Sequence, residues 1–259
     1  IQNRVKNRQK LWSIKGVFVV VIGLGNAGCN IATLFKKHSQ YDVILFNVGI
    51  NIPERKTVEE YEEKTPALTK YLKKVKGEVW FFVCGAEKIA ACSLRILEKI
   101  KNCDVNVVYI NPDPLMLSDY ALKRNRVTFN VLQEYTRSGL LNNIYLISNN
   151  HIIDIIGNEG LASYYNRIND LVANTIHAIN VYDNTDAMFG GISKSKEISR
   201  IKTLGLYNLE KNEEKLFFPL DNCTEVCYIY NVNDKKLKND KDLLPSIRKK
   251  IETMRLNKL

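Results

Sequence analysis

The chain has 259 residues, of which 45% are apolar, and a net charge of +10 at pH 7. It is long enough to bury a sizeable core, and no stretch reaches the roughly 20 apolar residues of a membrane-spanning helix, which excludes an integral membrane protein of the helical type. Six cysteines without a CxxC pair and three histidines in separate segments exclude a disulfide framework and a zinc site, and favour free thiols in the cytoplasm.

Positive charge is concentrated at both ends of the chain. Residues 1–15 carry a net charge of +5 and residues 235–259 carry +6, which leaves −1 for the residues between them. Basic ends suit an acidic partner, nucleic acid or a neighbouring subunit, although no base-reading motif accompanies them. Solvated tails are the other interpretation of the same residues.

Strand and helix patterns alternate along the first two-thirds of the chain. Continuous apolar runs predict buried strands, at 17–23, 41–48, 78–85, 104–113 and 142–150. Helical spacing predicts helices between and after them, at 26–38, once or twice within 51–76, and at 86–102, 118–139 and 151–182. This alternation predicts an α/β fold with a doubly wound, mostly parallel sheet.

The pattern changes after Gly191, where the residues become polar and mixed. One strand is predicted there, EVCYIYNV at 225–232, followed by a lysine-rich loop and a final helix, LLPSIRKKIETMRL. Alternation along that strand would place Cys223 and Cys227 on one face. We therefore expect three parts: a basic arm over 1–15, a main domain with a long central helix over 16–182, and a small, abridged α+β domain over 183–259.

The first predicted strand ends in a glycine turn, GLGNAG, in which Gly23, Gly25 and Gly28 have the spacing GxGxxG. Glycine allows a tight turn, a close approach of backbone to a ligand, and close packing of the next helix on the strand. The N–H groups at the start of that helix favour an anion. The turn therefore predicts a phosphate-binding site, of a kind shared by several classes of nucleotide-binding protein.

The next strand separates these classes. A nicotinamide-dependent enzyme has an acidic residue at the end of that strand for the ribose hydroxyl, whereas this strand ends in Phe46-Asn47-Val48-Gly49. The CxxC pairs typical of E1-like adenylate-forming proteins are missing as well. A Rossmann-type protein that binds some other adenine nucleotide stays open as an alternative.

Three stretches resemble the tubulin/FtsZ family. KGVFVVVIGLGNAGCNIATLF with DVILFNVG resembles its opening, and DVNVVYINPDPLMLSDYALKRNRVTFNVLQEYTRSGLLNNIYLISNNHIIDII resembles a later strand, long helix and strand. LASYYNRINDLVANTIHAI resembles the family's central helix, in which an aromatic residue precedes an Asn-Asp pair. The resemblance covers roughly residues 16–190 in the same order, and is to divergent members of the kind found on plasmids and phages.

The resemblance implies a nucleotide-binding domain with a guanine site for GTP or GDP, and with Mg²⁺. The phosphates would be lined by Gly23, Gly25, Asn26, Gly28 and Cys29, with Asn47 and Gly85 beside them. Tyr165 would stack on the base, while Asn169 and Asp170 would hydrogen-bond its edge. From the residues alone, a core position for Tyr165 and a solvated helix face for Asn169 and Asp170 are the alternatives.

The family's second glycine-rich phosphate loop corresponds to FFVCGAEKIAACSL, in which one glycine, Gly85, remains. The residues after it, Glu87 and Lys88, have side chains that do not suit a nest of backbone N–H groups. Glu87 also brings negative charge toward a phosphate. We therefore expect this loop to be degenerate.

In the family, an acidic loop after the central helix of one subunit completes the site of the next. Asp183 and Asp186 keep its D-x-x-D spacing, and two such carboxylates can orient a water or Mg²⁺; Asx turns at a helix end are the alternative. The sequence thus leaves two functions open: a GTPase whose subunits join head to tail into filaments, and a structural or interaction protein on the same fold without turnover.

Overall fold

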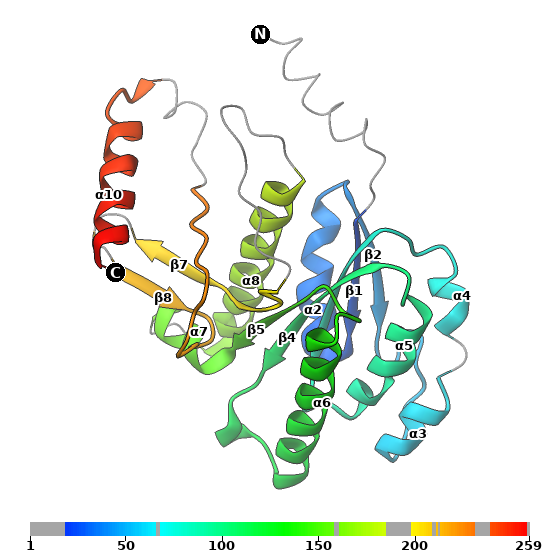
Figure 1. The fold of residues 1–259 in the computed structure, drawn as a ribbon. Helices are drawn as coiled ribbons and strands as arrows, with labels where there is room; N and C mark the ends of the chain where they lie inside the picture. The colour runs from blue at the N-terminus through cyan, green and yellow to red at the C-terminus, as the bar shows by residue number, and fades with distance from the viewer. Residues whose placement is uncertain are drawn as a thin grey trace.

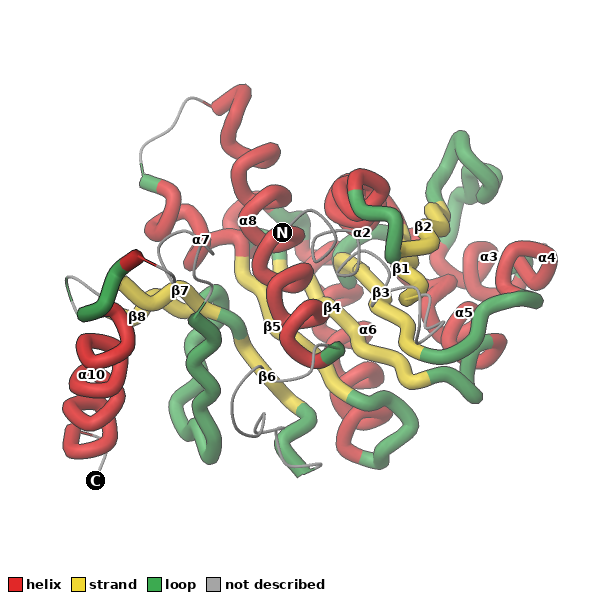
Figure 2. Tube along the Cα trace, turned by 90° about the horizontal axis from the view of Figure 1, so that it is seen from above, coloured by secondary structure: helices red, strands yellow, loops and turns green. Residues whose placement is uncertain are grey.

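The computed structural model describes residues 19–65, 68–157, 161–184, 198–208, 211, 213–230 and 239–257. In these residues, six strands form one sheet, seen from the side in Figure 1 and with all six strands labelled in Figure 2; all neighbouring strands are parallel, in the order β2-β1-β3-β4-β5-β6. The strands are β1 Val19–Leu24, β2 Tyr41–Phe46, β3 Glu78–Cys84, β4 Asp104–Asn111, β5 Asn143–Ser148 and β6 Ile201–Thr203. The five strands predicted for the main domain are confirmed, with small shifts at their ends.

Helices lie on both sides of this sheet (Figure 2). The α-helices are α2 Gly25–Thr33, α3 Val58–Glu63, α4 Thr69–Leu72, α5 Ser93–Lys99, α6 Asp119–Arg137, α7 Asn149–Ile156, α8 Leu161–Asp183 and α10 Leu243–Asn257. Short 3₁₀ turns are η1 Leu34–Lys37, η3 Lys88–Cys92 and η4 Pro114–Met116. The predicted doubly wound α/β architecture is confirmed, and α8 is the predicted central helix.

The core is divided into two layers because successive strand residues point to opposite faces of the sheet. On one face, Val21, Phe82 and Val108 pack in a buried cluster with residues of α2 and α8. On the other face, Ile22 and Phe81 pack in a second cluster with residues of α3, η3, α5 and α6. Strands that are apolar on both faces are therefore buried on both faces.

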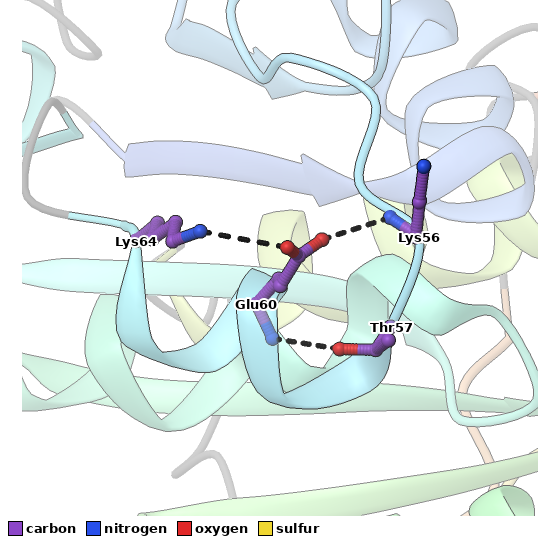
Figure 3. A network of polar contacts seen from close by, with 4 residues as sticks. All are labelled: Lys56, Thr57, Glu60 and Lys64. Carbon is purple, nitrogen blue, oxygen red and sulfur yellow. Dashed lines mark hydrogen bonds and ion pairs between the residues drawn. The ribbon is translucent and has the colours of Figure 1, made fainter.

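The helix in the charge-dense span 51–76 shows how local sequence fixes an element. Thr57 precedes α3, and its hydroxyl accepts a hydrogen bond from the N–H of Glu60 at 3.2 Å, while the Glu60 carboxylate accepts from the N–H of Lys56 at 3.0 Å (Figure 3). This reciprocal pairing resembles a capping box and satisfies backbone donors at the start of the helix. One turn later, Lys64 forms an ion pair with Glu60 at 3.5 Å.

The region after α8 differs from its prediction in one respect. Residues 225–230, part of the strand expected over 225–232, have no strand structure, so Cys223 and Cys227 do not share the face of a strand and are exposed free thiols. Strands are found earlier instead: β6 joins the main sheet beside β5, and β7 Gly205–Asn208 pairs antiparallel with β8 Glu213–Leu216. An alternating apolar pattern makes a strand only where a partner strand is available.

The predicted C-terminal helix is confirmed as α10. The basic arm over 1–15 lies outside the described residues. The domain boundary at residue 183 stays a prediction, although β6, which follows it in sequence, belongs to the main sheet. Among the described helices, none is both long and apolar enough to cross a membrane.

Candidate functional site

The glycine turn lies where β1 meets α2, at the carboxyl end of the parallel strands. Gly25 is the first residue of α2 and has φ +75°, a left-handed conformation that favours glycine. A Cβ on Gly23 would come within 2.8 Å of the Ala32 Cβ, and a Cβ on Gly28 would meet the carbonyl oxygen of Phe82. The three glycines therefore allow the turn and let α2 pack directly on β1 and β3.

The start of α2 holds a carboxylate from the same chain. The N–H of Asn26 donates to Glu87 Oε2 at 2.8 Å, and the N–H of Ala27 donates to Glu87 Oε1 at 3.1 Å. These are N–H groups of the first turn, where the helix dipole favours negative charge. Glu87 thus occupies the position at which a phosphate oxygen would be held.

The environment of Glu87 acts on its pKa in two directions. Burial raises the pKa of the Glu87 carboxyl above its usual 4.5, and the hydrogen bonds from Asn26 and Ala27 oppose that rise. A Cβ on Gly25 would contact Glu87 Oε2, so the carboxylate lies directly over the glycine turn.

The end of β2 supports the same turn from the other side. Asn47 Nδ2 donates to Asn26 Oδ1 at 2.8 Å, which joins the loop after β2 to the first residues of α2. Cys29 is buried below them, its Sγ donating to the carbonyl oxygens of Gly23 at 3.3 Å and Phe46 at 3.5 Å. Burial raises the pKa of the Cys29 thiol to about 11, so it is a core thiol and not a nucleophile.

The loop after β3 is closed by side chains. A Cβ on Gly85 would meet the Tyr109 hydroxyl, which donates to the carbonyl oxygen of Asn125 at 2.7 Å. From the same helix, α6, Arg124 Nε donates to the carbonyl oxygen of Ala86 at 3.1 Å. Cys84 and Ala86 are buried. This loop is therefore packed closely against α6 and β4.

The predicted base-recognition residues lie in the first half of α8. Tyr165 is 59% exposed and makes an edge-on contact with Tyr164, with ring centroids 5.0 Å apart. Asn169 is half-buried and Asp170 exposed. In the described part of the chain, no hydrogen bond joins Asn169 or Asp170 to the glycine turn. Their proposed contact with a base stays a prediction.

The predicted acidic pair lies at the other end of α8. Asp183 is the last residue of this 23-residue helix and is exposed, about 30 Å from its first turn at 1.5 Å per residue. Asp186 lies outside the described residues. Asp183 is close enough to Glu78, at the start of β3, for its charge to raise the pKa of the Glu78 carboxyl.

The structure thus brings together the glycine turn, Asn26, Asn47 and the Gly85 loop, while α8 packs against α2 through apolar residues of a shared buried cluster. Sequence reasoning placed Glu87 near the phosphate position but missed that its carboxylate binds the α2 N–H groups. The available signal was Glu87 itself, an acidic residue in a loop that the family resemblance predicts to bind an anion. The tertiary contact that converts it into a ligand spans sixty residues of sequence and has no local pattern.

Comparison with known proteins gives a fold. No family model and no curated sequence matches the chain. An empty FtsZ dimer from M. jannaschii matches with a TM-score of 0.53 at 13% identity, over 71% of this chain and 61% of that chain. A tryptophan-to-tyrosine mutant of M. jannaschii FtsZ matches with a TM-score of 0.52 at 13% identity, over 71% and 63%.

These values define a protein with a distant tubulin/FtsZ-like α/β fold. The chain spans about three-fifths of the length of the two FtsZ chains. At this level of identity the likeness concerns the fold, while activity has to be inferred from the site.

Proposed function

We propose that this chain is a divergent tubulin/FtsZ-like protein that acts as a structural or interaction module without nucleotide turnover. The observation that carries the proposal is the Glu87 carboxylate, bound at 2.8 Å and 3.1 Å by the N–H groups of Asn26 and Ala27. Those donors are the ones that a phosphate at the start of α2 would need, so the nucleotide implied by the fold does not fit the site as it stands.

Two further features support a site without nucleotide. A phosphate at the start of α2 would meet the negative charge of Glu87 at contact distance, and like charges in a partly buried site repel strongly. The second phosphate loop is closed by Tyr109 and Arg124. A ligand would have to displace Glu87 and also open the packing of α6 on this loop.

Calorimetry tests this proposal. The protein is titrated at high concentration with GTP, GDP and ATP in the presence of Mg²⁺, and its melting temperature is measured with each nucleotide. A ligand that binds only the folded state must raise the melting temperature. Since we expect no nucleotide to bind, we expect no binding heat and no shift in melting temperature. A micromolar dissociation constant for GTP would overturn the proposal.

A second function, a GTP-dependent filament former, is favoured by one observation. Asp183 lies at the end of α8 opposite its first turn, which is the arrangement that a head-to-tail junction requires. Under this alternative, GTP with Mg²⁺ raises light scattering, and Asp183→Ala or Asp186→Ala abolishes the rise. A matched substitution at exposed Asp170 separates the predicted junction from the predicted base contact, since Asp170→Ala weakens nucleotide binding itself.

The same titration separates the remaining alternative. Stabilisation by ATP or NAD without stabilisation by GTP would indicate a Rossmann-type protein with an adenine ligand. Under the leading proposal, self-association shows instead as a concentration-dependent sedimentation coefficient that is unchanged by any nucleotide.

A further inference from the structure

A buried polar cluster lies at the amino edge of the sheet, at the end of the molecule opposite the glycine turn. Its centre is the carboxylate of Glu78, the first residue of β3. Glu78 Oε1 accepts hydrogen bonds from Trp80 Nε1 at 2.8 Å, Asn106 Nδ2 at 3.3 Å and Asn180 Nδ2 at 3.3 Å. Glu78 Oε2 accepts one, from Asn184 Nδ2 at 3.2 Å. Two strands and the end of α8 thus converge on a single carboxylate.

The two oxygens of Glu78 are not equivalent. Three N–H donors already point at Oε1, so an added proton there would face all of them. Oε2 has one donor, Asn184 Nδ2, and is therefore the oxygen that a proton joins at lower cost. A protonated Oε2 carries an O–H group, which is a hydrogen-bond donor. This O–H and the N–H of Asn184 Nδ2 would then point at each other, so the hydrogen bond between them is lost.

We propose that Glu78 is a protonation-sensitive latch for the last turn of α8: the carboxylate ties Asn184 to β3, and a proton on Oε2 breaks that contact, which leaves Asn184 Nδ2 bonded only to the carbonyl oxygen of Asn180 at 3.0 Å within the helix. Asn180 stays in place when Asn184 leaves. It is 1% exposed, its Nδ2 faces the filled oxygen Oε1, and its Oδ1 accepts from the Tyr41 hydroxyl at 3.0 Å. The change is therefore confined to the residues that follow Asn180.

The charges around Glu78 favour its protonation. In the described residues Glu78 forms no ion pair, and its donors are neutral amides and an indole. Asp183 acts on it from α8, Asp104 lies opposite it on β4, and the end of α8 carries the negative pole of the helix dipole. Burial, the largest cause, and the charge of Asp183 both raise the pKa of Glu78.

The other titratable groups around the cluster behave differently. Tyr41 and Tyr145 face Glu78 from β2 and β5, and both have a raised pKa, so they stay neutral at neutral and acidic pH. His177, hydrogen-bonded to Tyr41 at 2.8 Å, has its pKa lowered to about 4. On β6, burial lowers the pKa of Lys202, and the nearby charge of Asp183 opposes that fall. Burial raises the pKa of Glu78, so this carboxylate takes up its proton at a higher pH than an exposed glutamate does.

Hydrogen exchange of the whole chain tests the latch. Protection factors for the amides of residues 181–184 are measured at pH 7 and pH 4.5, each corrected for the intrinsic exchange rate at that pH. In the wild type we expect protection of this turn to fall about tenfold at the lower pH, the loss expected for one hydrogen bond to a charged group. Protection of the central strands, such as β3 and β4, stays unchanged.

Two variants and one control make the result decisive. Glu78→Gln resembles the protonated side chain, so its last α8 turn should have low protection at both pH values. Asn184→Ala removes the exposed partner and should do the same without disturbing the fold. Glu60→Gln changes a half-buried glutamate of α3, far from α8 in the sequence, and should behave as the wild type (Figure 3).

Equal protection of residues 181–184 in the wild type and in Asn184→Ala would overturn the latch. So would a pH dependence that persists in Glu78→Gln, since another group would then carry it. The inference does not rest on the proposed function, because exchange at α8 is measured without nucleotide and without assembly.

Discussion

At the scale of single residues, Glu87 decides how the glycine turn is used. The N–H groups of Asn26 and Ala27 need an acceptor, since the first N–H groups of a helix have no partner within it. In this chain the acceptor is the carboxylate of Glu87, the residue that precedes η3. The carboxylate is both a partner for the backbone and a favourable charge for the helix dipole.

Removal of that carboxylate should therefore weaken the fold. We expect Glu87→Ala to lower the free energy of unfolding by about 2 kcal/mol, the cost of leaving partly buried N–H groups without a charged acceptor. Urea unfolding followed by circular dichroism measures it. Glu134→Gln, an exposed residue of α6 that pairs with Arg137, should change stability by less than about 0.5 kcal/mol. Equal losses in both variants would contradict a structural role for Glu87.

Gly25 provides an independent test of the same contact. Gly25→Ala forces an L-residue into φ +75° and brings a Cβ against Glu87 Oε2. Gly49→Ala is the matched control, because Gly49 has φ +81° but nothing within 4 Å of its Cβ position. We expect the control to lose about 1 kcal/mol and Gly25→Ala to lose clearly more. In the background of Glu87→Ala that excess should shrink, which a double-mutant cycle measures.

At the scale of elements, α6 packs on the loop after β3, where the family resemblance predicts a second phosphate loop. Tyr109 on β4 fills the space beside Gly85 and donates to Asn125 of α6. Asn125 Nδ2 in turn donates to Asn111 Oδ1 at 2.7 Å, at the end of β4. The loop, the strand and the helix are held together by one tyrosine hydroxyl and its partners.

Loss of that hydroxyl should destabilise the contact without changing the fold. We expect Tyr109→Phe to lower the free energy of unfolding by about 1–2 kcal/mol, because the buried acceptors of Asn125 lose their donor. Tyr120→Phe on α6 is the control, since Tyr120 is 77% exposed. This substitution should change stability by less than about 0.5 kcal/mol. An indistinguishable pair of unfolding curves would show that the hydroxyl has no structural role.

The elements also show what the sequence could predict. The strands β1 to β5 were predictable because strands of a buried parallel sheet are apolar on both faces, and α6 because Ser118 precedes it and Gly139, with φ +83°, follows it. Residues 225–230 have an equally apolar pattern, yet they form no strand, because a strand depends on a neighbouring strand that local sequence does not specify. The turn residues were predicted by motif, whereas the contacts of Glu87 and Glu78 depend on packing between distant segments.

At the scale of the whole molecule, titration of buried groups sets how stability depends on pH. His177 has its pKa lowered to about 4, mainly by burial and also by His38, whose ring stacks on it at a centroid distance of 3.9 Å. The unfolded chain binds this proton near pH 6.5, and the folded chain binds it only near pH 4. The contribution of His177 to stability is therefore lost as the pH falls from about 6.5 to about 4.

Two partly buried glutamates act with the opposite sign. Glu78 and Glu87 have raised pKa values in the folded chain, so the folded state takes up their protons first as the pH falls, and their contribution to stability rises.

We expect His177→Asn to flatten the loss of stability between pH 6.5 and 4, as measured by urea unfolding at half-unit steps. A variant that loses stability as steeply as the wild type over this range would exclude His177 as the cause.

The carboxylate at the start of α2 has a consequence for energy use. Under the proposed function, the anion at this site belongs to the chain and cannot be cleaved or depleted, so the state of the site would be independent of how much triphosphate the surroundings contain. Any polymer built from such subunits would grow or shrink only until it reached equilibrium with free subunits. Without hydrolysis there would be no second nucleotide state that could make one filament end grow while the other shrinks. Its length would be governed by concentration and by the partners that cap it.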